Sequence, residues 1–132
     1  MLTRVSVVAG ATRGADVLLD EGIFRRHGVH RYDHAEAAKG RFGAHNIHEN
    51  VPLPTVWQSD QIVLGTFFNG GLRAYDISNP YQPQQVGVFV PPAPPMAPTG
   101  TIQLNDVFVD EREIVYTVDR HAGGLYILEM DF

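Results

Sequence analysis

Cysteine is absent from this sequence of 132 residues, and the absence removes two kinds of chemistry. Without thiols the chain can form no disulfide framework. It also has no thiolate that could bind a metal or act as a nucleophile. Cysteine usage consequently gives no indication of the redox compartment in which the protein works.

Blocks of basic residues and long apolar runs are also missing. The 10 lysine and arginine residues are outnumbered by 15 aspartate and glutamate residues, which gives a net charge of -5. Nucleic acids and anionic membranes attract proteins through clustered positive charge, so we expect neither as a partner. No run approaches the roughly 18 apolar residues of a membrane-spanning helix, and Val5–Ala11 is too short for a good signal peptide. We therefore expect a soluble, cytoplasmic protein.

A complete dinucleotide-binding turn is the next absence. The β-branched run that begins at Val5 is followed by Gly10 and Gly14, which is similar to the nucleotide-binding turn of short-chain dehydrogenases. The further glycine, where a helix start approaches the pyrophosphate, is replaced by Ala15 and Asp16, and a carboxylate there would oppose the phosphates. We therefore interpret this segment as a surface or edge strand that ends in a glycine turn.

The most informative feature that is present is an internal repeat. Ile62–Ile77 (IVLGTFFNGGLRAYDI) aligns with Val115–Met130 (VYTVDRHAGGLYILEM), and a pair of glycines occupies the same place in both. Each copy indicates a β-hairpin, with Gly71 and Gly124 expected at positive φ. A repeat of roughly 50 to 60 residues built from short strands is typical of propellers, because one such unit cannot bury its own apolar face.

The strand pattern predicts an all-β fold class. We expect two propeller-type blades, an incomplete β-propeller, over residues 41–92 and 101–132, preceded by an irregular and partly helical segment over residues 1–40. The stretch Pro91–Pro98 is an extended connection, because proline cannot supply ladder hydrogen bonds. The expected strands are Gln61–Phe68, Leu72–Ile77, Val86–Val90, Gln103–Val109, Ile114–Val118 and Gly124–Met130.

The best candidate site begins with a histidine-rich bend. Gly43 permits a tight turn of the backbone, after which His45 and Asn46 can be aimed at one point. His45 and His48 are candidate metal ligands, but their spacing puts them on opposite faces of a regular strand. Binding one metal would therefore require a bend or a bulge between them. The alternative is a structural role, in which His45 and Asn46 hydrogen-bond to backbone groups.

The second copy of the repeat places polar residues opposite this site. Asn105 and Asp106 occupy the positions of His45 and Asn46 in the alignment. The innermost strands of a propeller surround a central channel, so equivalent residues converge on one axis. We therefore expect the side chains of His45 and Asn105 to point to a common polar channel. Asn46, Asn105 and Asp106 are the candidate residues for binding a small ligand there.

Three residues are candidate acids or bases if the protein is an enzyme. They are Glu49, Asp106 and His121, of which the last precedes the second glycine turn. With His45 and His48 as ligands they would suit a metal-dependent oxidoreductase or hydrolase. The alternative for His121, which follows Asp119 and Arg120 in a charged turn, is a solvated surface position.

Five motifs follow one another between Gly40 and Phe132. They are GAHNIHEN (Gly43–Asn50), GTFFNGGLRAYDISNP (Gly65–Pro80), VGVFVPP (Val86–Pro92), NDVFVD (Asn105–Asp110) and the stretch Tyr116–Glu129. Together they resemble the C-terminal part of LVIVD-repeat β-propeller proteins. The resemblance implies a propeller fragment or short paralogue that acts as a binding or scaffold module. Family chains are several times longer, and the first residues of this chain match them poorly.

The same family is distantly similar in architecture to the selenium-binding proteins. Some of those proteins are methanethiol oxidases that bind copper through histidines. The relationship implies His45 and His48 as candidate ligands of a copper or another divalent ion.

The two expected blades predict self-association. Two blades cannot close a ring, and the apolar run Ile62–Phe68 needs cover on both of its faces. We expect a homo-oligomer, most simply a dimer or trimer, with Val63 and Phe67 buried between chains. The alternative is that residues 1–40 fold over this strand.

Overall fold

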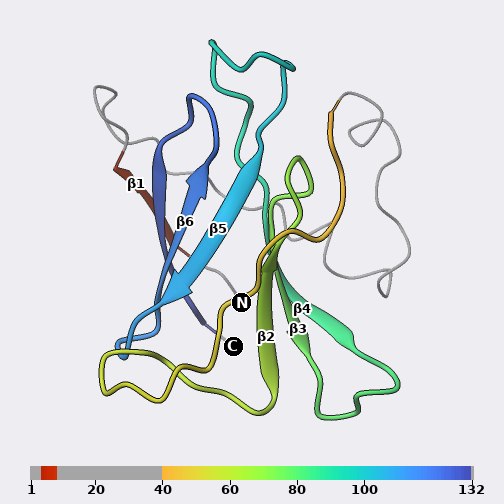
Figure 1. Ribbon diagram of the computed structural model, residues 1–132, viewed down its shortest axis with the longest axis vertical. Coiled ribbons are helices and arrows are strands. Elements are labelled where there is room, and N and C mark those ends of the chain that lie inside the picture. Colours follow the sequence, from red (N-terminus) through yellow and green to blue (C-terminus); the bar gives the residue numbers. More distant parts are fainter. Residues whose placement is uncertain (1–3, 9–39, 132) are drawn as a thin grey trace.

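The computed structural model describes residues 4–8 and 40–131, which form two antiparallel sheets (Figure 1). The first sheet has the strand order β2 (Ile62–Thr66), β3 (Leu72–Asp76) and β4 (Gln84–Phe89). The second has the order β1 (Arg4–Val8), β7 (Leu125–Glu129), β6 (Ile114–Asp119) and β5 (Leu104–Val109). The described residues contain no helix, and so none that could cross a membrane. The predicted all-β class is confirmed for this part of the chain.

Both predicted hairpins are present, as the pairs β2–β3 and β6–β7. Gly71 has a φ of 74° and Gly124 a φ of 78°, which confirms the positive φ expected at each turn. A side chain is strained in that region of conformational space. The two positions differ in their surroundings. A Cβ atom on Gly71 would overlap the carbonyl oxygen of Phe89, whereas a Cβ atom on Gly124 would meet open space.

The segment from Arg41 to His48 runs antiparallel along the free edge of β2. Bridges join Phe42 to Phe68 and Ile47 to Gly65. The backbone N–H groups of His45 and His48 donate to the carbonyl groups of Thr66 and Leu64 in β2, at 2.9 and 3.0 Å. This pairing fixes the backbone that carries the candidate site at the edge of the first sheet.

Strand β1 extends the second sheet on its opposite side. It pairs with β7, with Arg4 opposite Glu129, and forms the outer edge strand. The edge strand that the sequence predicted at the start of the chain is therefore present. The glycine turn expected after it, and the partly helical piece, fall in residues 9–39 and lie outside the described residues.

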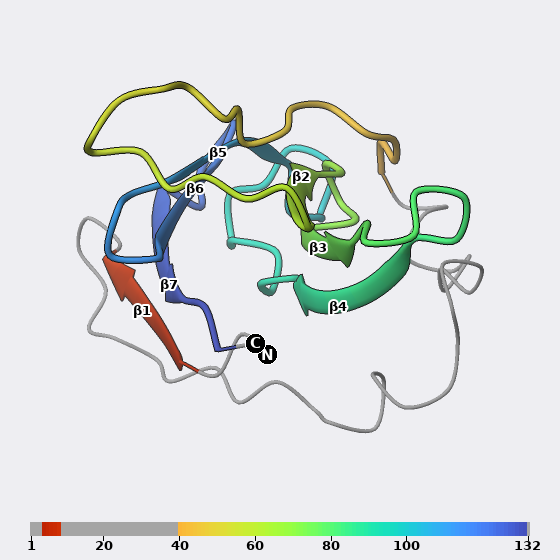
Figure 2. The ribbon, with the colours of Figure 1, turned by 90° about the horizontal axis from the view of Figure 1, so that it is seen from below.

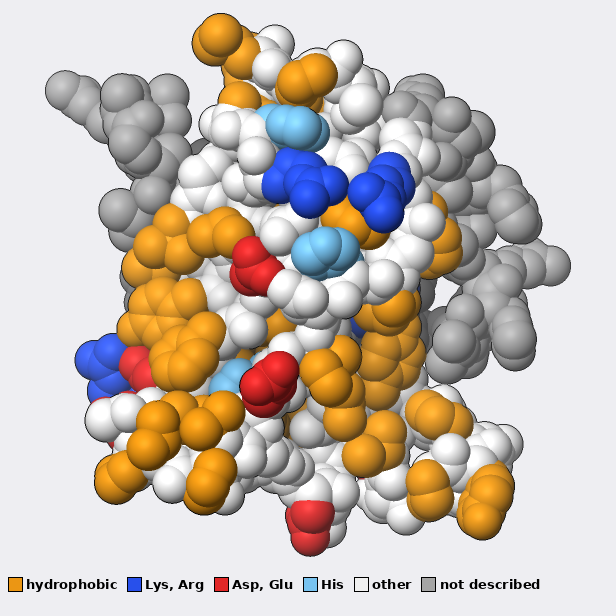
Figure 3. Space-filling model, in the orientation of Figure 1, with side chains coloured by type: hydrophobic (Ala, Val, Ile, Leu, Met, Phe, Trp, Pro, Cys, Tyr) orange, Lys and Arg blue, Asp and Glu red, His pale blue; other side chains and the backbone are white. Residues whose placement is uncertain are grey.

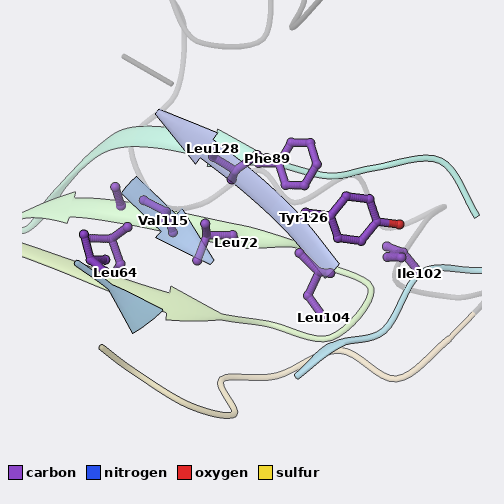
Figure 4. Close-up of a cluster of buried hydrophobic side chains, with 10 residues drawn as sticks. Leu64, Leu72, Phe89, Ile102, Leu104, Val115, Tyr126 and Leu128 are labelled. Carbon is purple, nitrogen blue, oxygen red and sulfur yellow. The ribbon is translucent and has the colours of Figure 1, made fainter. Parts of the chain in front are cut away.

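The two sheets pack face to face around an apolar core (Figures 2 and 4). Leu64, Leu72 and Phe89 of the first sheet meet side chains of β5, β6 and β7, including Leu104 and Leu128. Each fully buried aliphatic or aromatic side chain contributes about 1.5 to 3 kcal/mol through the area it removes from water. Since neither sheet encloses this core alone, the two repeats fold against each other and bring β2 beside β5.

Val63, on the other face of β2, and Phe67, directly after the end of β2, are half-buried. The Phe67 ring packs against the rings of Phe42 and Tyr75, with 6.1 Å between ring centroids in both pairs. The chain therefore covers part of this face itself. Burial of the rest between chains stays a prediction.

Candidate functional site

The repeat-equivalent polar residues meet in pairs at the seam between the two sheets. The Nδ1 atom of His45 lies 2.8 Å from the backbone carbonyl oxygen of Asn105, and the side-chain amide of Asn46 donates to Asp106 Oδ1. Because a carbonyl oxygen can only accept, Nδ1 of His45 carries the proton. The structure thus brings together four of the residues selected from the sequence, two from each copy of the repeat. We call these four residues the seam network.

Further hydrogen bonds hold the seam network in place. The side-chain amide of Asn105 donates to Asp106 Oδ2 at 3.0 Å, so each carboxylate oxygen of Asp106 faces an amide donor. The hydroxyl of Thr66, a fully buried residue of β2, donates to the carbonyl oxygen of Asn105 at 2.7 Å. The network therefore connects the first sheet, the edge segment and β5.

His45 presents its second ring nitrogen away from this network. With Nδ1 protonated, the neutral ring has its lone pair on Nε2, which can accept a proton or coordinate a ligand. The ring is exposed and contacts the edge of Phe68, with 4.6 Å between centroids. Of the two candidate metal ligands, His45 is therefore the one with a ring nitrogen that can still accept a hydrogen bond or coordinate a ligand.

His48 is used differently. The side chain is buried, its Nδ1 accepts from the backbone N–H of Val109 at 3.1 Å, and its Nε2 donates to the carbonyl oxygen of Trp57 at 2.8 Å. The ring also lies between Trp57 and Phe108, at 5.9 Å from each ring centroid. Both nitrogens are occupied, so His48 could bind a metal only by giving up its hydrogen bond to Val109 of β5 or to Trp57 in the loop before β2.

An open pocket of about 410 Å³ lies next to the seam network, on the face seen in Figure 3. Its lining consists of His45, Asn46, Ile47, His48, Glu49, Val51, Val107 and Phe108. Asn105 and Asp106 lie beside it and are joined to its wall through the network. Of the polar residues expected at a common channel, His45 and Asn46 line this open pocket, and the channel itself stays a prediction. The pocket wall is partly apolar, with Ile47 and Phe108 59% and 44% exposed.

The candidate acids and bases have separate locations. The exposed Glu49 lines the pocket, and Asp106 belongs to the seam network. His121 is exposed in the turn after β6 and does not line the pocket. Within residues 4–8 and 40–131 there is no group of three histidine, cysteine or carboxylate side chains that could hold a metal ion.

Asp119 shapes the turn that carries His121. Its Oδ2 atom accepts from three consecutive backbone N–H groups that begin at His121, and its Oδ1 atom accepts from the N–H of Gln103. A buried carboxylate satisfied by four backbone donors is a structural group. The sequence offered one sign of this role, namely an aspartate placed just before a glycine turn.

Asp110 fixes the turn between β5 and β6 in a similar way. Burial acts to raise the pKa of its carboxyl group. Hydrogen bonds from the Arg112 side chain, from the backbone N–H groups of Ile114 and Arg112, and from the Tyr116 hydroxyl outweigh that effect and lower the pKa. Asp110 is therefore held ionised by its hydrogen-bond partners.

Two arginines at the seam were not predicted from the sequence as site residues. The guanidinium carbon of Arg41 lies 4.3 Å from the centroid of the Phe68 ring, and that of Arg120 lies 5.4 Å from it. These residues are not equivalent in the repeat, so no sequence pattern connects them.

Comparison with protein-family models, with curated proteins and with solved structures finds no match for this chain. The geometry of the seam is therefore the basis on which a function is proposed.

Proposed function

We propose that the chain is a propeller-type binding module, similar to LVIVD-repeat proteins, that holds a small ligand at the seam between its two sheets. The observation that carries this proposal is the contact of equivalent residues, His45 with Asn105 and Asn46 with Asp106. In propellers, equivalent positions of successive blades converge in this way and line a ligand site. Here they converge beside an open pocket.

The strand arrangement supports the propeller part of the proposal. A propeller blade is a four-stranded antiparallel sheet, and neighbouring blades pack face to face. The second sheet has four strands, and the segment Arg41–His48 adds a short fourth element to β2, β3 and β4. The shared core lies between the two sheets, where two adjacent blades would pack.

The chemistry of the pocket indicates a ligand of mixed character. His45 Nε2 and the Glu49 carboxylate can accept hydrogen bonds, and the Asn46 side chain has amide hydrogens. Ile47 and Phe108 supply apolar wall beside these groups. A site with a few polar groups set in an apolar lining is typical of small-molecule recognition.

NMR titration with a set of small, neutral polar molecules tests the proposal. Ligands should shift the backbone amide signals of residues 45–49 and 105–108, and they should bind more weakly to Asp106→Ala. The control is Glu111→Ala, which removes an exposed carboxylate in the turn after β5. Ligands that shift other regions, or that bind both variants equally, would show that the seam is not the binding site.

A metal-dependent oxidoreductase or hydrolase is the alternative that His45 and His48 would support. It has less in its favour, because both ring nitrogens of His48 already make hydrogen bonds. Elemental analysis of the dialysed protein separates the two functions. Stoichiometric copper or zinc that is lost in His45→Ala would favour the enzyme over the binding module.

A further inference from the structure

Two positive side chains contact the same aromatic ring beside the seam network. Arg41 and Arg120 each lie over Phe68, and the His45 ring touches the edge of that ring. The two guanidinium groups can therefore be no further apart than the sum of their distances to the ring centroid. Figure 3 shows two basic side chains next to each other on this face, with a histidine beside them.

The backbone holds both arginines in position. The carbonyl oxygen of Arg41 accepts from the N–H of Asn69 at 3.2 Å, and the N–H of Arg120 donates to the carbonyl oxygen of Gln103 at 3.0 Å. Arg120 also belongs to the turn that Asp119 organises through its backbone hydrogen bonds. Two separate parts of the chain thus bring positive charge to one place in a protein whose net charge is -5.

Within the described residues, neither the Arg41 nor the Arg120 guanidinium forms an ion pair or a side-chain hydrogen bond. The Arg112 guanidinium, in contrast, forms an ion pair with Asp110. Each guanidinium has five N–H donors in a planar arrangement that matches carboxylate and phosphate oxygens. Placing two such groups near one ring costs electrostatic repulsion, which a bound anion would relieve.

We propose that Arg41 and Arg120 bind the acidic group of an organic anion, a carboxylate or a phosphate, beside the ring of His45. This inference rests on the proposed ligand site, since His45 both touches the Phe68 ring, which the two arginines contact, and lines the pocket. The acidic group contacts the arginines over Phe68. The body of the ligand extends past His45 to the apolar wall at Ile47.

Two carboxylates oppose an anion at this place, Glu49 in the lining of the pocket and Asp106 in the seam network. Both oxygens of Asp106 accept amide hydrogens, from Asn46 and Asn105, and Asp106 forms no ion pair with Arg41 or Arg120. The seam therefore has an acidic side, fixed by amides, and a basic side, formed by Arg41 and Arg120. Such a division orients a ligand that has an acidic group at one end.

Titration of the full chain with inorganic phosphate, phenyl phosphate and benzoate tests the inference, with NMR signals of residues 41–49 and 119–122 as the readout. We expect phenyl phosphate to bind more tightly than inorganic phosphate, because its ring reaches the pocket wall. Benzoate distinguishes carboxylate from phosphate recognition. Arg41→Gln and Arg120→Gln should each weaken binding about tenfold, as expected for the loss of a charge-assisted hydrogen bond.

Arg112→Gln is the charge-matched control, since it removes one positive charge in the turn at the other end of β5. Equal weakening in this control would mean that only net charge matters, and it would overturn the inference. If none of the three anions binds the wild type, while neutral molecules still shift residues 45–49, the anion site is refuted and the proposed ligand site is retained. If neither class binds, both are refuted.

Discussion

Replacing His48 by phenylalanine should destabilise the fold far more than the same replacement of His45. Phenylalanine keeps a planar ring of similar size but removes both ring nitrogens. At His48 it leaves the N–H of Val109 without its acceptor, which costs about 1 to 3 kcal/mol for a buried donor. It also removes the donor to the carbonyl of Trp57, which costs about 1 kcal/mol more. The expected loss is therefore about 2 to 4 kcal/mol.

His45→Phe is the matched comparison. The His45 side chain is exposed and makes one hydrogen bond, to the carbonyl oxygen of Asn105, so the expected loss is about 1 kcal/mol or less. Urea unfolding can be followed by circular dichroism and by the fluorescence of Trp57, the only tryptophan of the chain. Similar free energies of unfolding for the two variants would refute the structural role of His48. A larger loss for His48→Phe that appears only in the presence of added metal would do so as well.

Three further predictions concern the turns and the assembly. Gly124→Ala should lower the free energy of unfolding by about 1 kcal/mol, through positive φ alone. Gly71→Ala should lower it by about 3 kcal/mol, because the new Cβ also overlaps the carbonyl oxygen of Phe89 in β4. Equal urea midpoints for the two variants would contradict this. The pKa of Asp110 is lowered from 3.8, so the stability it provides is present above that pH and is lost as the pH falls through the lowered value. The difference in unfolding free energy between wild type and Asp110→Asn should therefore shrink below about pH 4, and a constant gap from pH 7 down to pH 2.5 would rule this out. Light scattering should detect a homo-oligomer that Phe67→Glu converts to monomer, whereas a well-folded wild-type monomer at micromolar concentration would end the idea of self-association.

The strands and hairpins could be predicted from the sequence because their signals are local. Short apolar runs mark the strands, and a glycine pair marks each turn within a few residues. The internal repeat added one long-range prediction, because it aligned His45 with Asn105 before any contact was known. That pair meets at the seam.

The role of His48 could not be predicted in the same way. Its acceptor bond reaches the N–H of Val109, which is 61 residues away, and the sequence contains no sign of that pairing. A histidine close to another histidine is typical of a metal site, and only the positions of both ring nitrogens show the structural use. Arg41 and Arg120 were missed for a related reason, since their common neighbour Phe68 is apparent only after the two sheets have packed.

The pairing of β1 with β7 has a consequence for the order in which the strands pair while the protein is being synthesised. Arg4 leaves the ribosome long before Glu129, its partner in the ladder. The strands β2, β3 and β4 are consecutive in the chain and can pair during synthesis, but β1 must wait until the last described strand has emerged. Throughout that interval an early apolar strand has an unpaired edge that chaperones or other nascent chains can bind. Completion of the second sheet is thus the late step at which misassembly competes with folding.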